Sequence, residues 1–269
     1  MADGQGILAA DESSGTIKKR FDTIGLTSTE DARRDYRELL FRSKQAMTDY
    51  ISGVILYDET IRQKAADGTP LVGLLKATGS VPGIKVDMGA KPMAGCPGEK
   101  LTEGLDGLSG RLKEYYELGA RFAKWRAVID ISPSTPSWTA LRANAHALAR
   151  YARLCQDAGI VPIVEPEVIM DGPDADHTID RCYEVTEWTL KTVFDELYEA
   201  RVSLEGMILK PNMVIAGQKC PTQASPEEVA EKTLKCLKAC VPAAVPGIAF
   251  LSGGQSDEAA TQHLSLMNA

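Results

Sequence analysis

Short apolar runs alternate with longer amphipathic stretches along the chain. The runs are rich in valine and isoleucine and too short for helices, which is typical of parallel strands buried on both faces. They recur at intervals of roughly 30–45 residues, the spacing of strand–helix units. The predicted strands are 6–10, 52–57, 83–86, 122–129, 160–164, 206–209 and 247–251.

Between these runs, apolar residues recur every three or four positions, as on one face of a helix. One such stripe extends from Leu141 to Cys155 and another from Tyr183 to Leu197. Ser225 followed by Pro226 predicts the start of a further helix, because serine at the N-cap and proline at the first helical position are both favoured. The stretch 90–107 is rich in glycine and proline and predicts a long surface loop.

Regular alternation of strands and helices predicts an α/β protein with a parallel sheet. A chain of 269 residues without a linker fits a (β/α)8 (TIM) barrel better than a doubly wound sheet. The GxGxxG pattern of a dinucleotide-binding sheet does not follow the first strand. We therefore predict one barrel domain over residues 1–269. Because seven strands are identifiable and a barrel closes on an eighth, the predicted barrel is incomplete.

Composition places the chain among ordinary globular proteins, with 44% hydrophobic and 25% charged residues. A net charge of −7 gives no electrostatic reason to bind nucleic acid. No apolar segment approaches the length of a membrane span, and the N-terminus lacks the pattern of a signal peptide. The six cysteines match no zinc or redox spacing, so we expect a reduced, cytoplasmic protein.

Charged residues gather at the C-terminal ends of the predicted strands, where barrel enzymes build their active sites. Side chains alternate along a strand, so Lys124 and Arg126 share one face, as do Glu165 and Glu167. If these faces point inward, lysines, an arginine and several carboxylates converge on one pocket. The strand-end set is Asp11, Lys85, Asp87, Lys124, Arg126, Glu165, Glu167 and Lys210.

A lysine among apolar residues suits nucleophilic chemistry. The neutral amine, which burial and nearby cations favour, condenses with a ketone or aldehyde to a Schiff base. Carboxylates then move the protons that dehydration and C–C cleavage require. No metal or other cofactor is needed for this chemistry, and the three histidines are scattered. Gly253 and Gly254, after the last predicted strand, offer backbone N–H groups that can bind a phosphate.

The strand-end residues lie in sequence segments that resemble those of the class I fructose-1,6-bisphosphate aldolase family. The similarity runs in family order from residue 6 to about residue 256, which is nearly the whole chain. It implies a metal-independent lyase of glycolysis and gluconeogenesis that reversibly cleaves fructose 1,6-bisphosphate to dihydroxyacetone phosphate and glyceraldehyde 3-phosphate. The matching segments include GILAADES, GVILYDET, GIKVD, FAKWR, GIVPIVEPE, EGMILKPNMV and GIAFLSGGQS.

The resemblance also implies a role for each matching residue. Lys210 corresponds to the Schiff-base lysine, Glu165 to the general acid and base, and Glu167 to its neighbour. Asp11 corresponds to the aspartate that assists C–C cleavage and orients the Schiff-base lysine, and Lys124 to the lysine that aids carbinolamine chemistry. The residues corresponding to substrate- and phosphate-binding positions are Lys85, Arg126, Ser252, Gly253, Gly254, Ser13, Thr16 and Arg20.

Two departures from the family pattern keep alternatives open. The helix before the first strand is essentially absent, and so are the eighth strand with its Tyr-Gly-Arg motif and the C-terminal tail. We therefore expect weaker binding of the bisphosphate. One alternative is a catalytically impaired fragment that serves as a binding or scaffold protein, and another is a lysine-dependent barrel enzyme for a monophosphate. Family members are usually cytosolic homotetramers, so the resemblance implies a homo-oligomer.

Overall fold

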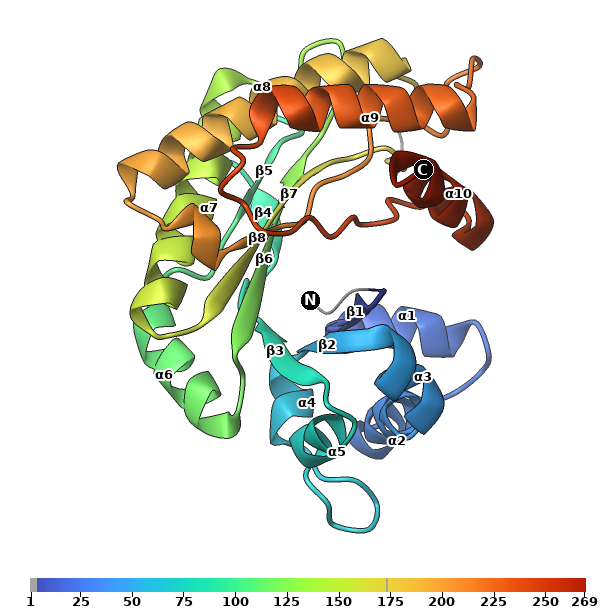
Figure 1. Ribbon diagram of the computed structural model, residues 1–269, viewed down its shortest axis with the longest axis vertical. Helices are drawn as coiled ribbons and strands as arrows, with labels where there is room; N and C mark the ends of the chain where they lie inside the picture. The colour runs from blue at the N-terminus through green and yellow to red at the C-terminus, as the bar shows by residue number, and fades with distance from the viewer. Residues whose placement is uncertain (1–3, 173) are drawn as a thin grey trace. The chain divides into compact units, whose positions relative to one another are not determined.

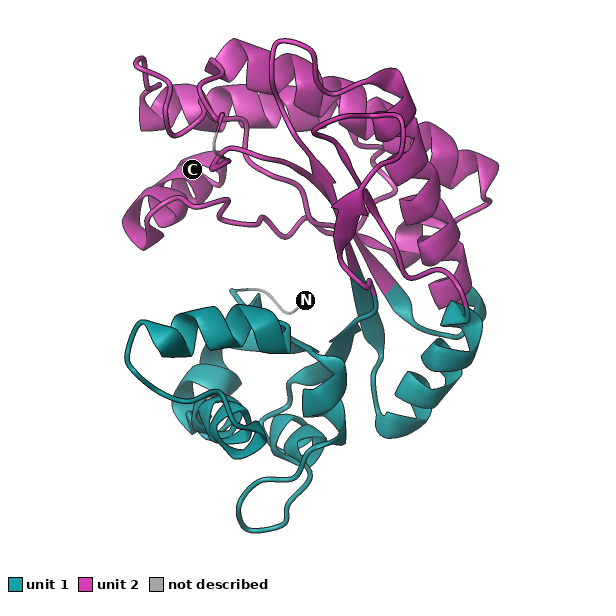
Figure 2. Ribbon diagram, turned by 180° about the vertical axis from the view of Figure 1, so that it is seen from behind, with its two compact units in different colours: residues 1–86, 107–124, 157–161 teal, residues 87–106, 125–156, 162–269 magenta. Residues whose placement is uncertain are grey.

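The computed structural model describes residues 4–172 and 174–269. It divides into two compact units whose segments interleave along the chain (Figure 2). Unit 1 comprises residues 1–86, 107–124 and 157–161, and unit 2 comprises residues 87–106, 125–156 and 162–269. The prediction of a single domain over residues 1–269 stays a prediction.

A six-stranded sheet in the order β1-β2-β3-β6-β7-β8 supplies the framework of both units (Figure 1). The pairs β1–β2, β2–β3, β3–β6 and β7–β8 are parallel, and helices connect successive strands. This arrangement confirms the predicted α/β fold, an incomplete (β/α)8 barrel. The strands are β1 (Gly6–Ala10), β2 (Ile51–Leu56), β3 (Val81–Lys85), β6 (Phe122–Ile129), β7 (Val161–Val168) and β8 (Ile208–Leu209).

Unit 1 packs its helices on β1, β2, β3 and the start of β6. Val54, Ile55 and Leu56 of β2 are fully buried. A close approach explains a glycine in β3, because a Cβ at Gly83 would lie 2.2 Å from the ring of Phe122. The helices of this unit are α1 (Ser14–Asp22), α2 (Glu30–Phe41), α3 (Lys44–Tyr50), α4 (Asp58–Arg62), α5 (Leu71–Ala77) and α6 (Leu108–Leu118).

Unit 2 contains the longest helices of the chain. Their apolar faces cover the remaining strands, and Ile129, Ile131, Val168 and Val185 form one buried cluster. The helix α9 packs against both α8 and α10 (Figure 1). Its predicted start is confirmed, since Ser225 caps it by accepting a hydrogen bond from the backbone of Glu228. The helices are α7 (Trp138–Asp157, of which the last residue belongs to unit 1), α8 (Ile179–Glu199), α9 (Pro226–Cys240) and α10 (Asp257–Met267), with a 3-10 turn at Leu204–Gly206.

The structure corrects two predicted elements. The predicted loop 90–107 contains an antiparallel hairpin of β4 (Ala90–Pro92) and β5 (Lys100–Thr102). The predicted strand 247–251 is reduced to one parallel bridge, between Leu209 and Ile248. Leu209 exchanges backbone hydrogen bonds with this segment, but the next donor along the ladder is Pro211, which has no N–H.

Among the described residues, no helix combines the length and the apolar character that crossing a membrane requires.

Candidate active site

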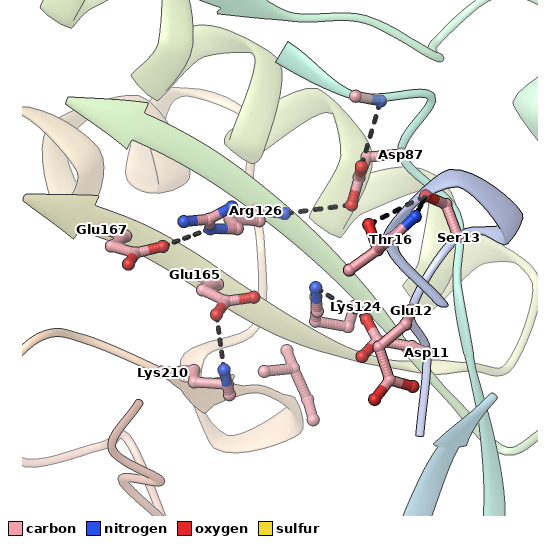
Figure 3. A network of polar contacts seen from close by, with 12 residues as sticks. Asp11, Glu12, Ser13, Thr16, Asp87, Lys124, Arg126, Glu165, Glu167 and Lys210 are labelled. Carbon is pink, nitrogen blue, oxygen red and sulfur yellow. Dashed lines mark hydrogen bonds and ion pairs between the residues drawn. The ribbon is translucent and has the colours of Figure 1, made fainter. Parts of the chain in front are cut away.

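A buried lysine–carboxylate pair lies at the ends of β7 and β8 in unit 2 (Figure 3). Lys210 directly follows β8, and its backbone N–H donates to the carbonyl of Val164 at 2.8 Å. Its Nζ donates a short hydrogen bond to Oε1 of Glu165. The two side chains are only 13% and 3% exposed. A carboxylate in this position can take up the ammonium proton and leave a nucleophilic amine.

A second ion pair lies beside it, between Arg126 of β6 and Glu167 of β7. Nε of Arg126 donates to Glu167, and the backbone N–H of Arg126 donates to Asp87 at 3.3 Å. Burial acts to lower the pKa of Arg126. The hydrogen bond to Glu167 and the charges of Glu167, Glu165 and Asp87 outweigh burial, so the pKa is raised. The guanidinium therefore stays charged.

The glycine pair of unit 2 forms a tight loop ahead of α10. Gly253 and Gly254 have φ angles of 58° and 78°, in the left-handed region that favours glycine. A Cβ on Gly253 would lie 2.6 Å from the Met170 side chain, and one on Gly254 would lie 2.6 Å from Nε2 of Gln218. Ser252 and Gly254 are exposed and Gly253 is partly exposed, so a ligand can reach the backbone of this turn, as an anion site requires.

Unit 1 holds its own lysine–carboxylate pair (Figure 3). Nζ of Lys124, in β6, lies 2.9 Å from Oδ2 of Asp11, which directly follows β1, and the side chains are 7% and 12% exposed. Lys85 stands beside Lys124 in the register of β3 and β6. Nζ of Lys85 lies 5.0 Å from the ring centroid of Tyr57, a cation–π distance.

The predicted phosphate contacts at the start of α1 have local partners in the structure. Ser13 is the N-cap of α1 and accepts a hydrogen bond from the backbone N–H of Thr16 at 3.3 Å, and the two hydroxyls lie 3.0 Å apart. The exposed Arg20 pairs with Glu12 at 2.5 Å. The phosphate role of these residues stays a prediction.

Sequence reasoning missed a buried arginine in unit 1. Arg37 is 1% exposed and donates to the backbone carbonyl of Glu12 at 2.8 Å, and its Nη2 lies 3.4 Å from the Glu12 carboxylate. Burial lowers the pKa of Arg37. Charged residues dominate this helix, EDARRDYRELLF, which hides the one that is buried. Arg37 is four residues before the buried Phe41 and so lies on the same helix face, and that spacing was the available signal.

The predicted site residues thus fall into two sets, one in each unit, and each set contains a buried lysine–carboxylate pair. Their predicted convergence on one pocket stays a prediction. Within the part of the chain that the structure describes, no group of three or more His, Cys, Asp or Glu side chains is placed to hold a metal ion.

Comparisons with known proteins agree on one family. The family model described as fructose-bisphosphate aldolase class-I matches residues 1–269. A probable class 1 fructose-bisphosphate aldolase of Xanthomonas campestris pv. campestris is 62% identical over 268 residues, covering 100% of this chain and 79% of the relative. Fructose-bisphosphate aldolase 1 of Toxoplasma gondii is 55% identical, covering 99% and 73%. The Plasmodium falciparum aldolase, solved with TRAP and a small-molecule inhibitor, superposes with a TM-score of 0.95 at 48% identity, covering 99% and 76%.

Proposed function

Since the chain belongs to the class I fructose-bisphosphate aldolase family, we propose that it reversibly cleaves fructose 1,6-bisphosphate through a Schiff base on Lys210. The products are dihydroxyacetone phosphate and glyceraldehyde 3-phosphate. The observation that carries this proposal is the buried pair of Lys210 and Glu165, which places a carboxylate within hydrogen-bond reach of the amine.

The first step is formation of the Schiff base. Glu165 takes a proton from the Lys210 ammonium, and the neutral amine attacks the ketone carbon of the substrate. A proton then moves from the new ammonium nitrogen to the alkoxide oxygen, which gives a carbinolamine. Glu165 then returns a proton to the carbinolamine hydroxyl, which leaves as water. Because Glu165 returns the proton that it removed, the condensation balances: the ammonium and the ketone give the protonated Schiff base and one water.

Cleavage follows from the electron demand of the protonated Schiff base. A base takes the proton of the hydroxyl at the fourth carbon, and the bond between the third and fourth carbons breaks. Its electron pair moves into the iminium, which gives an enamine and releases glyceraldehyde 3-phosphate. Protonation of the enamine and hydrolysis then release dihydroxyacetone phosphate and restore Lys210. By resemblance, Asp11 assists the cleavage and Lys124 the carbinolamine steps.

The two phosphates of the substrate explain the remaining charges and turns. Backbone N–H groups of the tight glycine turn are suited to one phosphate. Lys85 and Arg126 supply positive charge, and Arg126 keeps 43% of its side chain exposed while paired with Glu167. By resemblance, Ser13, Thr16 and Arg20 serve the other phosphate.

The test is reductive trapping. The chain is treated with dihydroxyacetone phosphate and borohydride, and the modified residue is identified by peptide mass spectrometry. We expect a stable adduct on Lys210, because borohydride reduces the iminium to a secondary amine. A folded protein without an adduct would overturn the proposal and favour the alternative of a binding or scaffold protein. Comparison of fructose 1,6-bisphosphate with fructose 1-phosphate as substrates tests the preference for two phosphates.

We also propose, from family resemblance, that the chain works in the cytoplasm as a homo-oligomer, a tetramer in the usual family form. The proposed partners are further copies of the chain and a sugar phosphate, with no nucleic acid or membrane. Light scattering after size-exclusion chromatography measures the assembly, and a mass of one chain at micromolar concentration would contradict it.

A further inference from the structure

The tight turn that we assign to a substrate phosphate is held by two glutamines. Nε2 of Gln255 donates to the carbonyl of Ser252 at 2.8 Å, and Nε2 of Gln218 donates to the carbonyl of Gly254 at 2.7 Å. Both glutamines belong to unit 2, as does the turn. Side chains therefore fix the two carbonyls on either side of Gly253.

A buried histidine fixes the first of these glutamines. His263, in α10, is 5% exposed, and its Nδ1 lies 2.6 Å from Oε1 of Gln255. Because Nε2 of Gln255 donates to Ser252, its oxygen faces the histidine and accepts, so Nδ1 carries the hydrogen. Burial lowers the pKa of His263, which favours the neutral ring with its proton on Nδ1.

Because the peptide bond is planar, the contact of Gln255 with the Ser252 carbonyl also orients the N–H of Gly253. The carbonyl of Ser252 and the N–H of Gly253 belong to one peptide unit and point in opposite directions. Gln255 holds this carbonyl with its side chain at 2.8 Å and with its backbone N–H at 3.2 Å, and so fixes the direction of the Gly253 N–H. The side-chain bond is the shorter of the two and is the one that His263 supports. Rotation of this peptide would misdirect the N–H and weaken any bound phosphate.

The turn also has a fixed position relative to the proposed Schiff-base lysine. The segment before it exchanges backbone hydrogen bonds with Leu209, at 3.1 Å and 2.9 Å, and Leu251 donates to the carbonyl of Pro211 at 3.3 Å. These bonds flank Lys210 on both sides. A donor fixed in the turn is thus fixed relative to the residue that carries the substrate.

We propose that His263 is a positioning residue for substrate phosphate, acting through Gln255 on the N–H of Gly253. This inference rests on the proposed function, because it assigns the turn to a phosphate of the same substrate. It predicts an effect confined to phosphate-bearing ligands.

The experiment compares two ketones in the trapping reaction. His263→Leu removes the donor, and His263→Asn replaces it with an amide N–H close to the position of Nδ1. For His263→Leu we expect the half-saturating concentration of dihydroxyacetone phosphate to rise about fivefold, the effect of one lost hydrogen bond. The maximal rate of adduct formation and the reaction with phosphate-free dihydroxyacetone should not change. His263→Asn should restore most of the affinity, and His146→Leu, at an exposed histidine of α7, should behave as the wild type.

Other outcomes overturn the inference. Equal losses with both ketones would show a merely structural role, and an unchanged half-saturating concentration would show no role. If His263→Leu does not fold, Gln255→Met tests the same link and should give the same phosphate-specific loss. Calorimetric binding of inorganic phosphate, which needs no Schiff base, keeps the two proposals separate. A wild-type chain that forms no adduct refutes the proposed function, whereas equal phosphate affinity of wild type and His263→Leu refutes this inference.

Discussion

The two units build the same kind of charge pair in different ways. In unit 2, Glu165 belongs to β7 and Lys210 directly follows the adjacent strand β8, and a backbone hydrogen bond to Val164 fixes their register. In unit 1, Asp11 follows β1 and Lys124 lies in β6, with β2 and β3 between them in the sheet. One pair is therefore made by neighbouring strands, and the other spans the face of a sheet.

The unit 1 pair depends on curvature. Neighbouring strands lie about 4.8 Å apart, so three such spacings separate β1 from β6. The 2.9 Å contact between Asp11 and Lys124 shows that the sheet of this unit bends toward the face that carries both side chains. The unit 2 pair needs only local register. We therefore expect the unit 1 pair to respond to changes in packing, and the unit 2 pair to respond chiefly to changes in its own chemistry.

The largest difference between the two pairs should follow from Lys210→Met, which removes the proposed nucleophile but keeps most of the side chain. We expect aldolase activity to fall by at least about 10⁴-fold, as for the loss of other covalent nucleophiles. Borohydride trapping should give no adduct at this position. The matched control is Lys191→Met, at a lysine of α8 that pairs with Glu187, and it should keep full activity. Full activity of Lys210→Met would refute its covalent role.

The two carboxylates give a second contrast, tested with Glu165→Gln and Asp11→Asn. For Glu165→Gln we expect both trapping and cleavage to fall by about 10³-fold, within the range for general acid–base groups. For Asp11→Asn we expect a larger loss in cleavage than in trapping, because its implied role is in breaking the C–C bond. Trapping with dihydroxyacetone phosphate and cleavage of fructose 1,6-bisphosphate are measured on each variant. Identical ratios of the two rates in both variants would remove the distinction between the carboxylates.

Much of this fold was predictable because its signals are local. The strands 6–10 and 122–129 were predicted with their observed bounds, since apolar runs bounded by polar residues indicate buried strands. The segment 247–251 was predicted as a strand, but its ladder breaks opposite Pro211, a residue of a different element. Hydrogen bonding between distant segments decides such cases, and periodicity carries no information about it.

The site shows the same limit. Alternation along β7 and the position of Lys210 at a strand end predicted the residues of the unit 2 pair. The contact of Asp11 with Lys124 requires the curvature of a whole sheet, and the link from His263 to Ser252 requires α10 to fold back onto its own preceding turn. Neither follows from the spacing of residues in the sequence.

A third prediction concerns stability in unit 1. Lys124→Met leaves the carboxylate of Asp11 buried without this partner, and we expect a loss of about 3 kcal/mol in the free energy of unfolding, as for other broken buried pairs. The double variant Asp11→Asn with Lys124→Met removes both charges and should recover part of that loss. Urea unfolding followed by far-UV circular dichroism measures the cycle. Additive losses in the double variant would show that the two side chains are not coupled.

The last prediction concerns how the stability of unit 2 depends on pH, and we expect this effect to be the smallest. All three histidines and all three tryptophans belong to unit 2, so tryptophan fluorescence reports the unit that contains every histidine. His177 is buried, and burial outweighs the opposing charge of Asp176 and lowers its pKa. The unfolded chain therefore binds this proton more readily than the folded chain. The resulting stability is present above the ordinary histidine pKa of about 6.5 and is lost as the pH falls toward the lowered value.

We accordingly expect urea unfolding, followed by tryptophan fluorescence, to occur at lower urea concentration at pH 5.5 than at pH 7. His177→Leu should reduce this difference, because it removes one of the groups that take up a proton on unfolding. It should leave part of it, since burial lowers the pKa of His263 as well. If His177→Leu left the difference between pH 5.5 and pH 7 unchanged, His177 would not be a source of the pH dependence. This prediction would then be wrong.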